Sequence, residues 1–212
     1  MDRKTSHPNN QDSAPSPSEK VGERNELYPI FLKLHQLNVL IVGGGNVGLE
    51  KLSFMLKSSP NANVEVVAMH FLPELLTLAE NHNVIITHSK FKKKMLKNKH
   101  LVIACTDNLE VNKRIYTVSK KRNLLANIAD TPEFCDFYLG GIVTKGNVKI
   151  AISTNGKSPT TAKRLREFFE EIIPDDINKM VENLNEYRKT LKGNFQEKVD
   201  KMNEITQSLK GK

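Results

Sequence analysis

Three glycines at a regular spacing are the first residues of the chain that could serve chemistry. Gly43, Gly45 and Gly48 form the pattern G-x-G-x-x-G directly after the apolar run at residues 39–42. In dinucleotide-binding turns the first glycine permits the tight turn, the second lets a pyrophosphate lie against the backbone, and the third lets strand and helix pack closely. The free N–H groups of the next helical turn would then face the phosphates. The pattern predicts a bound dinucleotide, and the alternative is a purely structural turn.

A carboxylate follows the apolar run at residues 101–105, which predicts a buried strand. The carboxyl ends of parallel strands line the ligand crevice of such sheets, so we expect Thr106, Asp107 and Asn108 to border the cofactor. The structural alternative is that Asp107, with Glu110 three residues later, forms an N-cap box for the next helix. Both roles can hold together.

A second carboxylate, Asp130, follows the strand predicted over residues 124–129. This position again lies at the carboxyl edge of the sheet, where a reacting group would be placed. Asp130 also precedes Thr131-Pro132, and aspartate commonly begins such turns. Position alone leaves both interpretations open.

The end of the second predicted strand, at residues 64–69, carries neither a carboxylate nor an arginine. In dinucleotide folds an acidic residue about 20 positions after the first glycine often holds the adenosine ribose. Glu65 lies near that distance but early in the strand. The residues leave NAD and NADP open, and His70 either contacts the ribose or faces solvent.

The order of these elements predicts an α/β fold with a Rossmann-like, doubly wound parallel sheet over residues 25–136. A β-hairpin is expected within residues 137–157, and because a lone hairpin is marginal in water it should pair with something, such as a second chain. Ser158-Pro159 is typical of a helix start, and residues 158–212 predict a small helical C-terminal domain. Residues 1–24 are expected to be a disordered tail.

The balance of charge indicates an acidic partner. The formal net charge is +8, from 32 Lys and Arg against 24 Asp and Glu. A nucleic acid, an anionic membrane or a polyanionic small molecule would fit, but the chain has no Trp and few aromatic rings on which bases could stack. The lysine-rich run at residues 91–100 is either a solvated helix face or an anion funnel.

The two cysteines, Cys105 and Cys135, are expected to be free, buried thiols in a reducing compartment. The N-terminus lacks the apolar stretch of a secretory signal, and no run approaches the ~20 apolar residues of a membrane span. We therefore expect a cytoplasmic protein, and no metal site is predicted.

Five separated motifs together resemble the precorrin-2 dehydrogenase family, which includes the dehydrogenase/ferrochelatase module of siroheme synthase. The resemblance covers about residues 26 to 175. Its motifs are Tyr28-Pro29-Ile30-Phe31, Gly43-Gly44-Gly45-Asn46-Val47, Thr106-Asp107-Asn108 with Asn112, residues 127–132 (NIADTP) and residues 153–159 (STNGKSP).

The resemblance implies an NAD-dependent oxidation of precorrin-2 to sirohydrochlorin in siroheme biosynthesis by a homodimer. It places NAD contacts on Asn46, Val47, Met69 and His70, and the catalytic aspartate on Asp130. Some members also insert ferrous iron, which is then a substrate. No histidine follows residue 173, so ferrochelatase activity stays open. The alternative function is an NAD-binding regulatory module without catalysis, and a nucleic-acid-binding protein is a third possibility that only the charge suggests.

The tetrapyrrole substrate that the resemblance implies is a polycarboxylate, so its site should be basic. The candidate residues for substrate binding are Asn108, Asn112, Lys157, Lys163, Arg164 and Arg166. The basic residues could equally be ordinary surface residues. Asn155 stands where the family often has glycine, and asparagine tolerates the left-handed conformation that such a turn requires.

Overall fold

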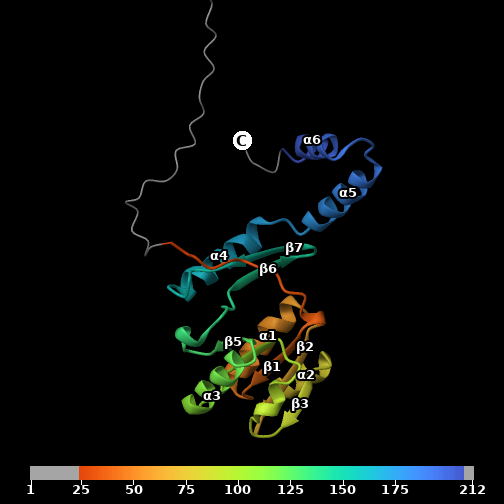
Figure 1. Ribbon diagram of the computed structural model, residues 1–212. Coiled ribbons are helices and arrows are strands. Elements are labelled where there is room, and N and C mark those ends of the chain that lie inside the picture. Colours follow the sequence, from red (N-terminus) through yellow and green to blue (C-terminus); the bar gives the residue numbers. More distant parts are fainter. Residues whose placement is uncertain (1–23, 208–212) are drawn as a thin grey trace, which may run out of the picture.

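The computed structural model describes residues 24–207, and the nucleotide-domain part of it is a five-stranded parallel sheet. The strand order is β3-β2-β1-β4-β5 (Figure 1). The strands are β1 (Asn38–Val42), β2 (Asn63–Ala68), β3 (Ile85–His88), β4 (Leu101–Ala104) and β5 (Leu125–Ile128). The chain winds outward from β1 in both directions, which places a topological switch point between β1 and β4.

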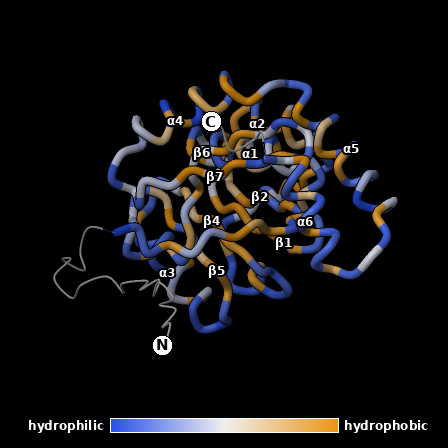
Figure 2. The backbone as a smooth tube through the Cα atoms, turned by 90° about the horizontal axis from the view of Figure 1, so that it is seen from above, coloured by the Kyte–Doolittle hydropathy of each residue, from blue (hydrophilic) through white to orange (hydrophobic). Residues whose placement is uncertain are grey.

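The central strands are apolar throughout because both of their faces are covered. All four residues of β4 are buried, and so are the last four of β1. Figure 2 shows these strands as hydrophobic stretches of the backbone. Strands with alternating polarity would leave one face wet, so these runs are typical of a sheet covered by helices on both sides.

Helices cover the two faces of the sheet with separate apolar clusters. One cluster holds residues of α1 (Asn46–Ser58) and α2 (Pro73–Asn81), and the other holds Ile115 of α3 (Leu109–Lys120) and Leu96 of the 3-10 helix η2 (Lys93–Leu96). The prediction of a Rossmann-like α/β fold is therefore confirmed. The lysine-rich run at residues 91–100 forms only the short η2, not the longer helix that we expected.

Two short segments outside the sheet contain 3-10 helices. Residues 27–33 contain no strand, and the 3-10 helix η1 (Leu34–Gln36) comes directly after them. This lead-in passes beside the hairpin, where the Asn25 side-chain amide lies 3.4 Å from the Ser153 carbonyl oxygen (Figure 1). Another 3-10 helix, η3 (Pro132–Phe134), follows β5. The predicted tail lies outside the described residues, except for its last position.

The β-hairpin consists of β6 (Gly141–Lys145) and β7 (Val148–Ile152), paired antiparallel. Its turn has two residues, Gly146 and Asn147, and Gly146 has a φ of 57°, as such hairpin turns require. Both strands lie within residues 137–157, where the hairpin is predicted. Pairing starts at Gly141 opposite Ile152, and β7 ends there, so residues 137–140 have no partner strand.

The C-terminal helices are α4 (Pro159–Ile172), α5 (Ile177–Thr190) and α6 (Phe195–Ile205). α4 contacts both hairpin strands, and its predicted cap is present: the Ser158 side chain accepts a hydrogen bond from the Thr161 N–H. None of the three helices contains a buried residue. Among the described residues, no helix is long and apolar enough to cross a membrane.

Candidate active site

The glycine turn joins β1 to α1 at the centre of the sheet. Gly43 has a φ of 132°, and a Cβ added there would lie 2.5 Å from the Cys105 carbonyl oxygen. A Cβ at Gly48 would lie 2.2 Å from the Gly43 carbonyl oxygen, so this glycine lets α1 approach the turn. A Cβ at Gly45 would meet nothing within 4 Å. Gly43 and Gly48 therefore serve the fold, whereas Gly45 opens onto free space.

The first turn of α1 is suited to an anion. Its N-cap, Gly45, has no side chain that could accept from the helix, and the turn contains no acidic residue. The N–H groups at the start of a helix need acceptors, and the positive end of the helix dipole favours negative charge there. Asn46 and Val47 are the first two residues of this turn. These features fit the pyrophosphate of a dinucleotide lying against Gly45.

The segment after β2 lies beside the glycine turn. The Gly43 N–H donates to the Val67 carbonyl at 3.0 Å, and the Leu72 N–H donates to the Gly44 carbonyl at 2.9 Å. Met69 and His70, between these two bonds, are exposed. They therefore lie next to the glycine turn, at the edge where the ribose of a dinucleotide would be placed.

Glu65 is committed to a different interaction. Its carboxylate accepts from Lys99 Nζ at 2.8 Å and from the Thr87 hydroxyl at 2.8 Å. Burial alone would raise the pKa of Glu65, but the hydrogen bonds from Lys99 and Thr87 and the charge of Lys99 together lower it. Glu65 thus holds β2, β3 and the segment before β4 together, and it is not available to bind a ribose.

The loop after β4 is held by Asn112 of α3. The Thr106 hydroxyl donates to Asn112 Oδ1 at 2.7 Å, and Asn112 Nδ2 donates to the Thr106 carbonyl at 2.9 Å. Asn112 is only 5% exposed. Its burial and its two bonds fit a residue that positions Thr106, and contact of Asn112 with substrate stays a prediction.

The cap of α3 also differs from expectation. Asn108, not Asp107, is the N-cap, and its Oδ1 accepts from the Val111 N–H at 3.0 Å. The N-cap position is set by where the helical backbone begins, and that register cannot be read from the spacing of Asp107 and Glu110. Asp107 is exposed at the carboxyl edge of the sheet.

Asp130 occupies an unusual backbone position one strand further along. It is exposed and has a φ of 58°, in the left-handed region that non-glycine residues seldom adopt but aspartate tolerates. The Thr131 N–H donates to the Ile128 carbonyl at 3.2 Å and closes a tight turn around it. Because Ala104 pairs with Ile128, the loops after β4 and β5 emerge side by side.

The loop that carries Asp130 is anchored by residues we did not predict. Asp136 accepts from the Ala126 N–H at 2.9 Å and from Lys120 Nζ at 2.6 Å, and the Asp136 N–H donates to the Ala126 carbonyl at 2.7 Å. Asn127 Nδ2 donates to the Phe137 carbonyl at 2.8 Å. These bonds return the chain to β5 after residue 130 and so fix the base of the loop.

The basic residues of α4 are neutralised by glutamates of the same helix. Arg166 pairs with Glu170 at 2.7 Å, Arg164 pairs with Glu167 at 2.8 Å, and Lys163 lies 3.9 Å from Glu167. No ion pair is recorded for Lys157 within residues 24–207. In this part of the chain no hydrogen bond or ion pair joins α4 to the strand ends at Gly43, Thr106 or Asp130 either. Within a single chain, the cations of α4 are therefore not bonded to the candidate site residues at these strand ends.

The two thiols and the ionisable groups give no metal site in the described part of the chain. Cys105 is buried beneath the glycine turn, where its thiol donates to the Val42 carbonyl at 3.3 Å, and Cys135 is half-buried in the loop after β5. Within residues 24–207 no group of three or more His, Cys, Asp or Glu side chains could hold a metal ion.

Comparison with known proteins agrees with this geometry. Residues 30–141, just over half of the chain, match the family described as "Putative NAD(P)-binding", and the match spans the glycine turn and the loops after β4 and β5. The chain belongs to this NAD(P)-binding family. Residues 145–172, which include the hairpin turn, β7 and α4, match a second family described as "Sirohaem biosynthesis protein central".

The relatives in this family are longer proteins. The chain is 37% identical to the siroheme synthase of Pseudoalteromonas translucida over 83% of its own length and 37% of that protein. It is 34% identical to the siroheme synthase of Zymomonas mobilis over 79% of its own length and 35% of that protein. The chain thus spans little more than a third of the curated relatives it matches.

A solved structure shares the fold. The protein named "SirC, precorrin-2 dehydrogenase" superposes with a TM-score of 0.70 over 84% of this chain and 89% of that one, at 23% sequence identity. At this identity the likeness shows the fold alone.

Proposed function

We propose that the chain is an NAD-dependent dehydrogenase that oxidises precorrin-2 to sirohydrochlorin in siroheme biosynthesis. The observation that carries the proposal is the placement of Asp130, an exposed carboxylate in a left-handed turn directly after β5. Thr106 follows the neighbouring strand β4, so both residues lie at the carboxyl edge of the sheet. The dinucleotide-type glycine turn lies one strand beyond, at the same edge. Both family matches and the names of the relatives support this assignment.

Each group at the edge has a role in this reaction. The N–H groups of Asn46 and Val47 and the open face of Gly45 hold the pyrophosphate, Gly43 and Gly48 shape the turn, and Met69 and His70 border the adenosine ribose. The bound NAD supplies the hydride acceptor. Thr106 and Asp107 border its nicotinamide half, and Asn112 keeps Thr106 in place. We assign NAD on the resemblance to the precorrin-2 dehydrogenase family, because the β2 end offers neither a carboxylate for the ribose nor an arginine for a 2′-phosphate and so leaves NAD and NADP open.

Asp130 acts as the general base. Oxidation of the macrocycle removes a hydride and a proton, and the Asp130 carboxylate accepts that proton. A correctly placed base contributes about 10²–10⁴ in rate. Asn108 and the cations Lys157, Lys163, Arg164 and Arg166 hold the carboxylates of the substrate. The ion pairs of Lys163 and Arg164 with Glu167 are largely exposed, so each contributes only ~0–1 kcal/mol and can yield to a substrate carboxylate, whereas the Arg166–Glu170 pair is part-buried.

The active assembly is a homodimer in the cytoplasm. We divide the chain into a nucleotide domain (residues 25–136), a dimerisation segment (137–157) and a helical domain (158–212). The unburied C-terminal helices support this division, because they leave apolar residues for a second copy to cover. No observation favours ferrous iron insertion, since residues 24–207 contain no cluster of three metal-binding side chains.

The test is NADH formation when the purified protein meets precorrin-2 and NAD. Asp130→Asn keeps the shape of the side chain and its tolerance of the left-handed turn but cannot accept a proton. We expect it to lower kcat by about 10²–10⁴ while NAD affinity is unchanged. Asp200→Asn on α6 is the matched control and should behave as wild type.

Two outcomes would contradict the proposal. Full turnover by Asp130→Asn would refute the assignment of the base. NAD binding without any oxidation of precorrin-2 by the wild-type protein would favour a regulatory module instead.

A further inference from the structure

The net positive charge of the chain is concentrated in one short segment. Residues 90–122 contain 11 Lys and Arg but only two acidic residues, which gives a net charge of +9, whereas the whole chain carries +8. The remainder of the molecule is therefore close to neutral. Such a concentrated field attracts anions, and its location is more informative than the total charge.

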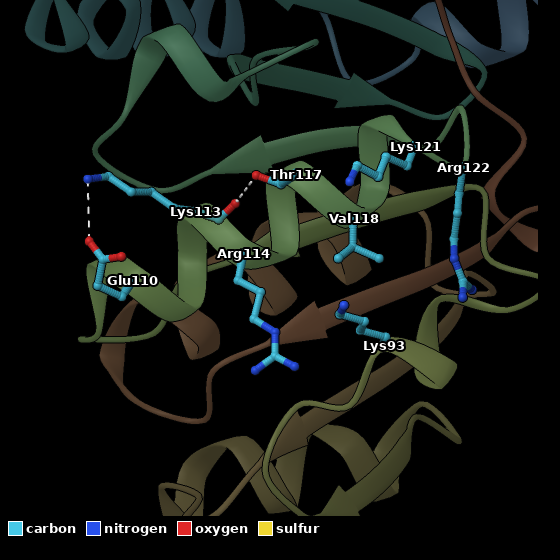
Figure 3. A pocket seen from close by; sticks show the side chains of 8 residues that line it. All are labelled: Lys93, Glu110, Lys113, Arg114, Thr117, Val118, Lys121 and Arg122. Carbon is cyan, nitrogen blue, oxygen red and sulfur yellow. Dashed lines mark hydrogen bonds and ion pairs between the residues drawn. The ribbon is translucent and has the colours of Figure 1, made fainter.

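The segment folds around a groove between α3 and η2. Figure 3 shows this groove, which has a volume of about 570 Å³ and is lined by five cations. They are Lys93 of η2, Lys113 and Arg114 of α3, and Lys121 and Arg122 just after α3. Glu110 is its one carboxylate. None of the residues of the glycine turn or of the Asp130 loop lines it, so it is distinct from the candidate active site.

Three of these cations face the same space. Arg114 lies in the middle of α3, Arg122 lies two residues after the end of this helix, and Lys93 lies on η2. In Figure 3 the Arg114 and Arg122 side chains point toward the side of η2, and Lys93 lies between them. The three cations thus form a row along the groove.

These three cations have no counter-charge. Lys113 pairs with Glu110 at 3.4 Å, at the end of the groove away from Arg122 (Figure 3). No ion pair is recorded for Lys93, Arg114 or Arg122 within residues 24–207. Lys121 and Arg122 follow the C-terminus of α3, where the helix dipole favours cations. The dipole explains neither Arg114 in mid-helix nor Lys93 on another element, and the gathered like charges repel one another unless an anion lies between them.

We propose that this groove binds a ligand with two or more linked phosphate groups, either a free oligophosphate or the oligophosphate chain of a nucleotide. Guanidinium forks match phosphate oxygens in pairs, and a row of three cations fits a linear polyanion. The volume lies in the range of small-molecule sites. Val118 is the only large apolar side chain in the lining, and no aromatic ring is present, so the groove offers neither a hydrophobic anchor for a protein nor a stacking platform for bases.

The experiment is calorimetric titration of the full chain, saturated with NAD, with tripolyphosphate and with ATP. Arg114→Ala/Arg122→Ala is expected to weaken tripolyphosphate binding roughly tenfold or more, because two charge-assisted contacts are lost. Lys179→Ala/Lys201→Ala removes the same charge from exposed positions on α5 and α6 and should bind as wild type. Glu110→Gln removes the one carboxylate of the lining and should tighten binding about twofold.

The comparison of ligands identifies what is recognised. Equal affinities for tripolyphosphate and ATP mean that the groove recognises only the phosphate groups. Tighter binding of ATP means that the natural ligand is a nucleotide. Either result supports the proposal. Citrate, a tricarboxylate, should bind more weakly than tripolyphosphate.

Equal losses in the groove variant and in the control would overturn the proposal. So would citrate binding as tight as tripolyphosphate, or duplex DNA that binds more tightly than tripolyphosphate through the same two arginines. The groove variant is compared with its own control, so the outcome is independent of whether the proposed dehydrogenase reaction occurs.

Discussion

At the level of single residues, the three glycines of the turn have different roles: two are required by the packing of the turn and one is not. A Cβ at Gly43 or Gly48 would collide with backbone oxygens at 2.5 and 2.2 Å, whereas a Cβ at Gly45 would meet nothing within 4 Å. Gly45 also has a φ of −87°, which any residue can adopt. The fold does not require glycine there, so the missing side chain serves a ligand.

Gly45→Ala should therefore impair NAD binding, whereas Gly48→Ala should impair the stability of the fold. Gly45→Ala should keep or slightly raise the melting temperature, because it reduces the entropy of the unfolded chain by about 0.4–1 kcal/mol, while it weakens NAD binding. Gly48→Ala should lower the free energy of unfolding by about 1–3 kcal/mol through overpacking. Thermal unfolding and NAD titration of both variants check this, and wild-type NAD affinity in Gly45→Ala would refute it.

The Cys105 thiol should be inert despite its place under the turn. Burial raises its pKa to about 12, and burial also raises the pKa of Cys135. Because only the thiolate reacts, labelling of the folded protein at about pH 8 should be slow at both sites and should speed up as the pH rises toward the pKa. Two thiols should react rapidly after denaturation. Fast modification of Cys105 in the folded chain would show that the turn opens.

At the level of elements, the loop from β5 to the hairpin carries Asp130 and is anchored to the nucleotide domain by hydrogen bonds. Asp136 bonds the backbone of Ala126 in both directions and also pairs with Lys120 of α3. The hydrogen bond with Asp136 raises the pKa of Lys120. A second link joins the hairpin to the nucleotide domain, since Lys149 Nζ donates to the Ser58 carbonyl at the end of α1 at 2.6 Å.

Loss of Asp136 should loosen this loop and so displace Asp130 from its position in the candidate active site. Asp136→Ala leaves the Ala126 N–H without its acceptor and should cost about 1–3 kcal/mol of stability, together with a fall in kcat at unchanged NAD affinity. Lys120→Met removes only the exposed ion pair and should cost at most ~1 kcal/mol. Denaturant unfolding and steady-state kinetics measure both. Identical effects of the two substitutions would mean that only the ion pair matters.

At the level of the whole molecule, the C-terminal helices α4, α5 and α6 leave their apolar residues at least partly exposed. Along α4, Leu165, Phe168 and Ile172 are 38%, 52% and 51% exposed, and they follow one face of the helix. In the lead-in, Tyr28 and Phe31 are 86% and 68% exposed. Exposed apolar patches of this kind mark protein interfaces.

Disruption of the α4 stripe should therefore dissociate the proposed homodimer. We expect Phe168→Glu/Ile172→Glu to shift the protein from dimer to monomer in light scattering coupled to size exclusion. Thr160→Glu, at an exposed position on the same helix, should remain dimeric. A monomeric wild-type protein would contradict the proposed assembly.

The sequence by itself determined the architecture and the place of the cofactor turn. Buried parallel strands must be continuous apolar runs, and a glycine turn after the first of them can hold a dinucleotide, so both features appear as local patterns. The hairpin turn at Gly146-Asn147 and the Ser158 cap are local in the same sense. Each of these depends on residues within a few positions of one another.

Only the tertiary structure decided which side chains are free to act. Asn112 and Glu65 are polar residues near the expected site, and in the structure Asn112 bonds Thr106 while Glu65 bonds Lys99 and Thr87. Asp136 bonds Ala126, ten residues away, and no sequence pattern around Asp136 predicts that bond. Lys93 meets Arg114 and Arg122 in one groove although they are some twenty to thirty residues apart in the chain. Hydrogen bonds and like charges act over a few ångströms in space, and which distant residues come within that range is fixed by how the elements pack.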